Sequence, residues 1–280
     1  GSEMCIRDRN MKGETMKKLE GKIAIVTAST RGIGYACVET LAAEGARVYM
    51  ACRNISLGRE KAEALRLRGL DVKTVYFEAY DRASIVAMVD DVVKNEGRID
   101  ILVNNFGGTS PVDDKTIFDT NYERFIRYMD AHMGTVFLAS QRALTKAMCR
   151  QKSGTIINIG SVAGLIPDVS QLAYGSSKAA IIHLTKIIAT QAAAFNVTCN
   201  AVCPGMTATE AVKNNLSPEF QEFFLKHTPI RRIGEPQEVA DAVLYFACSE
   251  YTTGQVLAVH GGFSVPTPVY GDMLLMKNKR

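Results

Sequence analysis

The chain has 280 residues, of which 47% are hydrophobic and 22% charged, and its formal net charge is +4. This length and composition suit one large α/β domain rather than two. The charge is small and Lys and Arg are spread along the chain without blocks, which argues against a nucleic-acid-binding surface.

Residues 1–15 resemble no structural segment and begin with Gly-Ser, so we expect a tag or cloning remnant followed by a disordered lead. The folded domain is expected to span residues 16–265, and residues 266–280 form a C-terminal tail.

Residues 22–27 predict a buried parallel strand that runs directly into the glycine turn at residues 28–34, ASTRGIG, and then into a helix ending near residue 44. A strand, a glycine turn and a helix form a dinucleotide-binding unit, because the turn brings backbone N–H groups and a helix N-terminus to a pyrophosphate. Thr30, Arg31 and Ile33 are the turn residues expected to contact this cofactor. The alternative is a tight turn without a ligand.

The end of the second predicted strand, residues 46–51, indicates which cofactor binds. An acidic residue at this point would bind the ribose hydroxyls of NAD. The chain has Cys52-Arg53 instead, and Arg31 lies in the glycine turn. Two guanidinium groups suit a 2′-phosphate, so the expected cofactor is NADP(H), although either Arg is also compatible with an ordinary surface charge.

Further along, residues 56–68 and 81–96 are predicted helices around a third strand at residues 72–77. Glu78 and Ala79 follow this strand, where the adenine is expected. A fourth strand at residues 100–104 leads into Asn105-Phe106-Gly107-Gly108, and helical segments follow to about residue 150.

Residues 155–178 carry the expected chemistry: a strand at 155–159, Ser161 at its end, and a helix that holds Tyr174 and Lys178. Tyr and Lys at this spacing lie on the same face of a helix. A cation ~4 Å from a phenol, at an effective dielectric of ~20, contributes about 4 kcal/mol. Lowering a phenol pKa from ~10 to ~7 takes about the same energy. Tyr174 is therefore expected to be an acid/base with a pKa lowered by Lys178, the alternative being an ordinary helix pair.

The remaining elements complete an alternating pattern. They are strands at residues 197–203 and 255–259 and helices at residues 218–226 and 238–248. About seven strands alternating with helices predict a doubly wound, Rossmann-type parallel sheet with helices on both faces, whose ligand lies at the carboxyl ends of the strands.

Two further features limit the possible function classes. Seven cysteines without C-x-x-C pairing indicate buried thiols in a reducing compartment, so no metal is expected and the location is taken as the cytoplasm. The most apolar predicted helix, residues 179–195, is interrupted by His183, Lys186 and Gln191 and is not expected to enter a membrane.

These motifs resemble the short-chain dehydrogenase/reductases over residues 18–265. The resemblance rests on the glycine turn, the N-N-F-G segment, Ser161, Tyr174-x-x-x-Lys178, the run N-A-V-C-P-G-M-T-A-T at residues 200–209, and Gly261-Gly262. It implies that Ser161 positions the substrate oxygen, Tyr174 is the acid/base, and Lys178 holds the nicotinamide ribose while lowering the Tyr pKa. The other cofactor contacts that it implies are Asn105, Gly107, Gly205, Met206, Thr207 and Thr209.

Within the family, the chain is most similar to bacterial bile-acid hydroxysteroid dehydrogenases, above all the 7α-specific ones. The T-x-S-T-R-G-I-G turn, R-I-D-I-L-V-N-N-F-G, I-P-D-V-S before the Tyr, and G-G-F with T-P-V-Y in the tail carry this likeness. Three positions depart from the family pattern: Ala28 replaces a turn Gly, Phe106 replaces an Ala, and His132 replaces an Asn whose backbone carbonyl orders a water of the proton relay. His132 is either part of the relay's outer end or a packing residue.

The expected substrate is a rigid apolar alcohol or ketone such as a steroid or bile acid, because a lid at about residues 206–227 and the tail are both rich in apolar side chains. These side chains also suit packing between subunits, and the resemblance implies a homotetramer. The alternatives are a hydroxysteroid dehydrogenase of 12α or 3α position, a 3-oxoacyl-thioester reductase, and a non-catalytic NADP(H)-sensing protein.

Overall fold

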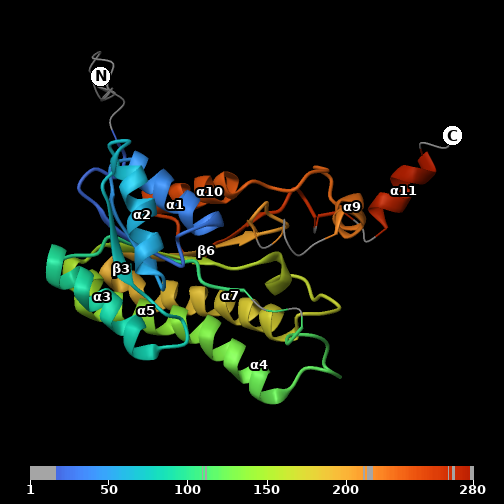
Figure 1. Cartoon of the computed structure of the whole chain (residues 1–280), viewed down its shortest axis with the longest axis horizontal. Helices are drawn as coiled ribbons and strands as arrows, with labels where there is room; N and C mark the ends of the chain where they lie inside the picture. Colours follow the sequence, from blue (N-terminus) through green and yellow to red (C-terminus); the bar gives the residue numbers. More distant parts are fainter. Residues whose placement is uncertain are drawn as a thin grey trace, which may run out of the picture.

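A parallel β-sheet of seven strands runs through the middle of the molecule (Figure 1). The computed structural model describes residues 17–108, 110, 112–210, 212, 217–263, 265–266 and 269–277. The strand order is β3-β2-β1-β4-β5-β6-β7, and every neighbouring pair is parallel. The strands are β1 (Ile23–Thr27), β2 (Arg47–Cys52), β3 (Val72–Tyr76), β4 (Ile101–Asn104), β5 (Gly154–Ile159), β6 (Val197–Pro204) and β7 (Val256–Val259).

Helices cover both faces of this sheet, as Figure 1 shows. One face carries α1 (Gly32–Ala43), α2 (Ile55–Arg66) and α10 (Pro236–Cys248), whose buried side chains share one apolar cluster with alternate strand residues. The other face carries α3 (Arg82–Glu96), α5 (Thr135–Ala143) and α7 (Leu172–Ala192), which share a second cluster. Strands β1 and β6 are buried along their whole length, which explains the nearly continuous apolar sequence of β1.

One long helix crosses the second face and passes beside the site at the turn that carries His132. It consists of α4 (Tyr122–Met129), the π-helical turn η1 (Asp130–Gly134), α5, a second π-helical turn η2 (Leu144–Met148) and α6 (Cys149–Gln151). A π-helical turn inserts one extra residue and so re-aims the side chains that follow it. In this helix η1 carries His132, whose side chain is fully buried.

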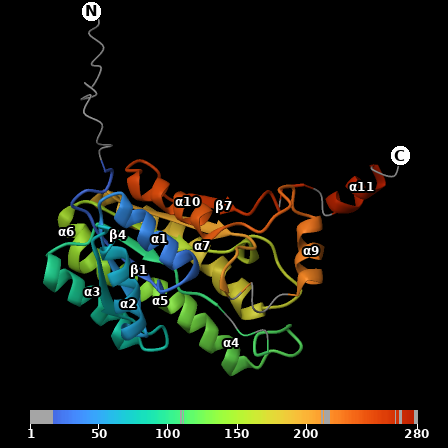
Figure 2. The same ribbon diagram turned by 45° about the horizontal axis from the view of Figure 1, so that its top comes forward.

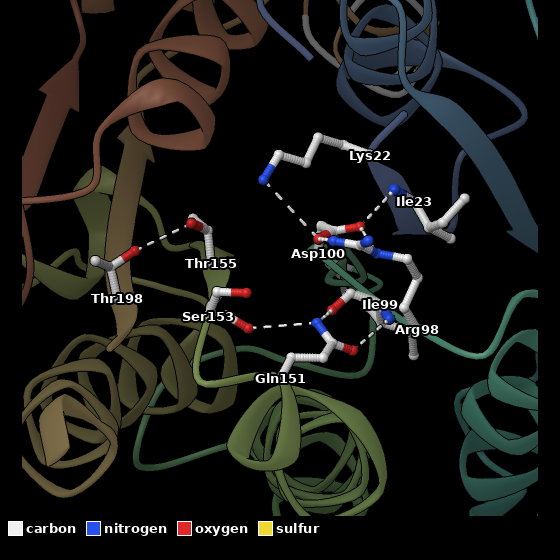
Figure 3. A network of polar contacts seen from close by, with 9 residues as sticks. All are labelled: Lys22, Ile23, Arg98, Ile99, Asp100, Gln151, Ser153, Thr155 and Thr198. Atoms are coloured by element: carbon white, nitrogen blue, oxygen red, sulfur yellow. Dashed lines mark hydrogen bonds and ion pairs between the residues drawn. The ribbon is translucent and has the colours of Figure 1, made fainter. Parts of the chain in front are cut away.

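A polar network joins the amino ends of the central strands, at the edge of the sheet away from the site (Figure 3). The buried Asp100 carboxylate accepts hydrogen bonds from the Ile23 backbone N–H at 2.9 Å and from Arg98 Nε at 2.9 Å. Gln151 accepts from the Ile99 N–H at 3.0 Å and donates to the Ile99 carbonyl at 2.9 Å. The network therefore ties β1, β4 and the end of the long helix together.

The last helices lie beyond the carboxyl end of the sheet (Figure 2). Helix α9 (Pro218–Lys226) stands over this end, and α11 (Tyr270–Lys277) projects from it. An ion pair joins Lys226 of α9 to Asp272 of α11, and the rings of Phe224 and Phe263 stack at 4.2 Å. The expected lid at residues 206–227 includes residues 211 and 213–216, which lie outside the described part of the chain, as do residues 1–15.

The predicted doubly wound sheet with helices on both faces is confirmed. The sequence-based start of the last long helix was late by two residues, since α10 begins at Pro236. Pro is favourable in the first turn of a helix, and Glu235 and Glu238 form a capping box there.

Among the described residues, no helix is long and apolar enough to cross a membrane. The short 3-10 turns are η3 (Val162–Gly164) and η4 (Ala193–Phe195).

Candidate active site

The glycine turn between β1 and α1 presents free backbone donors at the carboxyl end of the sheet. No side chain caps the N-terminus of α1, whose N-cap is Arg31. A helix start without a side-chain cap leaves N–H groups available to an anion. Ala28 in this turn has φ +51°, a left-handed conformation that costs an L-residue about 1–2 kcal/mol. The position therefore has the backbone conformation for which the family pattern uses Gly.

Two observations fit this turn to a dinucleotide phosphate. The Ser29 hydroxyl is buried and has no hydrogen-bond partner within the described chain. A side chain at Gly34 would come within 2.7 Å of the Ala28 carbonyl oxygen, so only glycine allows this close approach of helix and turn. Thr30 is half-buried in the turn, and Ile33 packs against the apolar cluster of the first face. These residues form a cradle suited to the cofactor that the sequence predicts.

Both arginines expected at the 2′-phosphate lie at the rim of this cradle and pair with carboxylates. Arg31 Nη1 is 3.5 Å from Glu210 Oε2, and Arg53 Nη1 is 3.5 Å from Glu78 Oε2. Both guanidinium groups are mostly exposed, at 70% and 78%. Ala79 is buried among the apolar residues of the second face. The arginines are therefore accessible to an incoming phosphate that replaces these carboxylates.

Ser161, Tyr174 and Lys178 are brought together at the carboxyl ends of β5 and β6. Ser161 lies near enough to the Tyr174 phenol to lower its pKa. Lys178 is almost fully buried at 2% exposure, and its Nζ donates to the Ile159 carbonyl at 2.7 Å. The Lys178 Nζ lies 5.6 Å from the centre of the Tyr174 ring. The folded chain therefore brings the three predicted residues close together.

The pKa values of this group differ from the sequence-based expectation. Burial raises the pKa of Tyr174 above its ordinary value, a hydrogen bond with Ser161 opposes the rise, and Cys203 adds to it. Burial lowers the pKa of Lys178 to about 8. The expected lowering of the Tyr174 pKa by Lys178 is therefore wrong for the protein without cofactor. The reason is desolvation, since the ammonium is directed at a backbone carbonyl and the phenol has lost water.

The loop after β4 braces the glycine turn and lies against Lys178. Asn105 Nδ2 donates to the carbonyls of Thr27 at 3.1 Å and Ala28 at 3.2 Å. A side chain at Gly107 would come within 2.5 Å of Lys178 Nζ, so glycine is needed for the lysine to lie there. Asn105 and Gly107 therefore lie between the glycine turn and Lys178.

The loop after β6 closes the other side of the cradle. Thr207 is buried at 4% exposure, and its hydroxyl donates to the Gly205 carbonyl at 3.1 Å. A side chain at Gly32 in the glycine turn would meet Thr209 Cγ2 at 3.2 Å, so these two loops touch. Met206 lines a cavity of about 330 Å³ between this loop, α9 and the end of β7. The expected cofactor contacts of this loop therefore lie beside the turn.

Asp114 is a residue of the site that sequence reasoning missed. Its carboxylate is buried at 1% exposure and accepts the backbone N–H groups of Ala173 at 2.8 Å and of Tyr174 at 3.0 Å. It thereby caps the first turn of α7, where Gln171 has a left-handed conformation and supplies no cap of its own. The signal for this contact is long-range, because Asp114 lies 60 residues before Tyr174.

The described residues contain neither a disulfide bond nor a candidate metal site. The six described cysteines are all free thiols, and burial raises the pKa of Cys203, below Lys178, to about 11. No group of three or more His, Cys, Asp or Glu side chains within the described ranges could hold a metal ion.

Comparison with known proteins gives matches to reductases and dehydrogenases over most of the chain. A family profile described as Enoyl-(Acyl carrier protein) reductase matches residues 27–264. The chain is 44% identical to a 7alpha-hydroxysteroid dehydrogenase of Clostridium sardiniense, over 92% of this chain and 98% of that protein. It is 35% identical to the 3-oxoacyl-[acyl-carrier-protein] reductase FabG of Staphylococcus aureus, over 86% of this chain and 97% of that protein.

Solved structures have the same architecture. A short-chain type dehydrogenase/reductase from Mycobacterium marinum superposes with a TM-score of 0.83 at 31% identity, covering 90% of this chain and 98% of that chain. The doubly wound sheet is therefore shared with that protein.

Proposed function

The chain belongs to the short-chain dehydrogenase/reductase family, and from this premise we propose that it interconverts a hydroxyl group and a ketone on a steroid or bile acid with NADP(H), as a 7α-hydroxysteroid dehydrogenase. The observation that carries the proposal is the Tyr174 ring with the buried Lys178 ammonium 5.6 Å from its centre and Ser161 nearby, next to a turn suited to a dinucleotide.

In this proposal Tyr174 transfers the proton and Ser161 positions the substrate oxygen. In the reducing direction Tyr174 gives its phenol proton to the carbonyl oxygen, and in the oxidising direction it takes the hydroxyl proton. Ser161 Oγ accepts the Ala163 N–H at 3.1 Å, and in this proposal its hydroxyl donates to the same substrate oxygen. When bound, the nicotinamide supplies or accepts the hydride.

Lys178 has two roles in this proposal. One of its three N–H bonds is used by Ile159, so the others are available to the nicotinamide ribose. Its positive charge also favours the phenolate form of Tyr174, and an oxidised nicotinamide ring would add a second positive charge. Together these charges oppose the desolvation that raises the pKa of Tyr174 in the protein alone.

The preference for NADP(H) rests on Arg31 and Arg53. Both guanidinium groups lie at the rim of the cradle and are exposed, and guanidinium groups bind phosphate in a bidentate manner. We assign the remaining cofactor contacts to Thr30, Ile33, Glu78, Ala79, Asn105, Gly107, Gly205, Met206, Thr207 and Thr209.

The steroid assignment is supported by the 7alpha-hydroxysteroid dehydrogenase of Clostridium sardiniense and by apolar side chains beside the site. Leu165 and Ile166 after Ser161 are exposed at 41% and 36%, and Phe220 and Phe223 of α9 at 49% and 64%. Such a surface suits a rigid apolar ring system better than a flexible chain.

A second candidate is a 3-oxoacyl-thioester reductase, because the chain is also 35% identical to such an enzyme. A panel separates the candidates: 7α-, 7β-, 12α- and 3α-hydroxy bile acids with NADP+ or NAD+, beside 3-oxoacyl thioesters with NADPH, followed at 340 nm. The proposal requires turnover of the 7α-hydroxyl with NADP+. Turnover of the thioesters alone would replace it with the second candidate, and turnover of another position would change the regiospecificity.

We also propose that the enzyme acts as a homotetramer in the cytoplasm. Ile126, Met133, Phe137 and Ile187, on α4, η1, α5 and α7, are exposed at 44%, 38%, 47% and 39%, and packing against another subunit would cover them. The free thiols are consistent with a reducing compartment. Light scattering of the purified chain tests the assembly, and a monomeric mass would contradict it.

A further inference from the structure

His132 lies in the π-helical turn η1, directly behind the catalytic tyrosine. Its side chain has no exposed surface, and its ring meets the Tyr174 ring edge-on, with centres 5.9 Å apart and an angle of 89°. The rings of Phe106 and Tyr128 contact the other sides of the imidazole, at 5.7 Å and 6.0 Å. Three aromatic rings therefore enclose the imidazole.

Both ring nitrogens of His132 have polar partners on two different parts of the site. Nδ1 lies 2.8 Å from the Ser177 hydroxyl, and Nε2 lies 3.0 Å from the Gly108 carbonyl oxygen. A neutral imidazole has two arrangements here. With its proton on Nε2 it donates to the Gly108 carbonyl and accepts from the Ser177 hydroxyl. With its proton on Nδ1 it donates to that hydroxyl, which in turn donates to the Tyr174 carbonyl, and Nε2 accepts the Gly108 N–H at 3.4 Å. Burial and the charge of Lys178 lower the pKa of His132 to about 4, so the neutral imidazole prevails at pH 7.

These two contacts connect the floor of the cofactor cradle to the catalytic helix. Gly108 ends the loop after β4, and its neighbour Gly107 lies against Lys178. Ser177 lies in the first turns of α7, and its hydroxyl is 2.8 Å from the Tyr174 carbonyl oxygen. A rigid ring between the loop and the helix fixes their separation, because a buried aromatic group in close packing has little freedom to shift.

We propose that His132 is a positioning residue for the reaction: its imidazole spans from Gly108 to Ser177 and holds the Tyr174 ring at a fixed distance from the cofactor cradle. The inference deepens the proposed function, since it treats Tyr174 as the acid/base. A displacement of ~1 Å at a reacting group costs on the order of 10²-fold in rate, so an effect on turnover is expected.

Three substitutions separate the parts of this contact. His132→Asn keeps an amide near the Nδ1 position and its bond to Ser177, whereas His132→Gln reaches toward Gly108. His132→Phe keeps a ring among Phe106, Tyr128 and Tyr174 but loses both hydrogen bonds. Phe246→Leu is the control, because this buried ring lies in α10 on the other face of the sheet and its loss should lower stability alone.

The first readout is steady-state kinetics with whichever ketone the wild type reduces. His132→Phe is expected to lower kcat at least tenfold with changes below threefold in KM and in the Kd for NADPH. The isotope effect on kcat with NADPH deuterated at the transferred hydrogen should rise, because hydride transfer becomes slower than product release. Phe246→Leu should lower Tm and leave the isotope effect unchanged. A His132→Phe enzyme with wild-type kcat and isotope effect would overturn the proposal.

The second readout needs no turnover and therefore separates this inference from the proposed substrate. Hydrogen–deuterium exchange of peptides covering residues 104–108 and 172–178 should be faster in His132→Phe than in the wild type, and partly restored in His132→Gln or His132→Asn. Unchanged exchange in both peptides would overturn the positioning role even if the steroid assignment holds. Absence of steroid turnover in the wild type, with faster exchange in the variant, would overturn only the proposed function.

Discussion

The buried ammonium of Lys178 should reduce the stability of the protein at neutral pH. Its pKa is lowered from 10.5 to about 8 by burial, and at 1.36 kcal/mol per pKa unit the cost is about 3 kcal/mol. Replacing Lys178 with Met removes this cost but leaves the Ile159 carbonyl without its donor, a loss of about 1–2 kcal/mol. Lys178→Met should therefore raise the free energy of unfolding by about 1–2 kcal/mol at pH 7 while abolishing turnover.

The dependence on pH identifies the cause. Because the folded-state pKa is the lower one, the unfolded wild type binds more protons between pH 8 and 10.5, and wild-type stability gains about 3 kcal/mol across that window. Lys178→Met lacks this gain, so its advantage should disappear near pH 10. Urea unfolding followed by circular dichroism at pH 7, 8, 9 and 10 measures the difference. A variant less stable than the wild type at pH 7, or a difference that stays constant with pH, would refute the reasoning.

Three further substitutions test separate contacts. Arg53→Gln should weaken the binding of NADPH relative to that of NADH by about 10- to 100-fold, because a charge-assisted hydrogen bond contributes about 1.5–3 kcal/mol. Fluorescence titration measures both affinities, and an unchanged ratio would refute the phosphate contact. Asp114→Ala should cost about 1–2 kcal/mol of unfolding free energy and lower kcat, because the Tyr174 backbone N–H loses the carboxylate that accepts its hydrogen bond. Asp114→Asn should retain most of the stability and of kcat. Equal losses in the two variants would point to the charge rather than the cap. Asp100→Ala should lower the unfolding free energy by about 2–3 kcal/mol, because the Asp100 carboxylate loses its hydrogen bonds from Ile23 and Arg98. These bonds lie at the amino ends of the strands, away from the site, so kcat should not change. A loss of kcat in the folded variant would contradict the independence of this network from the site.

Much of the fold follows from local sequence patterns. Strands such as β1 and β6 are buried on both faces and so appear as apolar runs, and the helices around them show apolar periodicity. Ser161, Tyr174 and Lys178 were also predictable, because one strand end and one helix bring them together. Helix boundaries were less certain: α10 begins two residues earlier than its apolar pattern suggests.

Contacts between distant segments could not be read from local patterns. The Asp114 cap of α7 and the contact of His132 with Ser177 join residues 59 and 45 positions apart. The pKa of Tyr174 was also out of reach, because the sequence places a lysine nearby but does not show that its ammonium bonds to Ile159 or that the phenol is desolvated. The left-handed conformation of Ala28 could be predicted from the local sequence, because Ala28 stands where the family pattern of the turn has a glycine.

The role of Tyr174 as the group that exchanges a proton with the substrate is tested most directly by single-turnover reduction of a 7-oxo bile acid by Tyr174→Phe with bound NADPH. The phenol ring is kept and only the hydroxyl is lost, so the Kd for NADPH should stay within about threefold. The rate of NADPH oxidation should fall by at least about 10²-fold, the usual contribution of a positioned acid. A Tyr174→Phe enzyme that oxidises NADPH at the wild-type rate would show that another group supplies the proton.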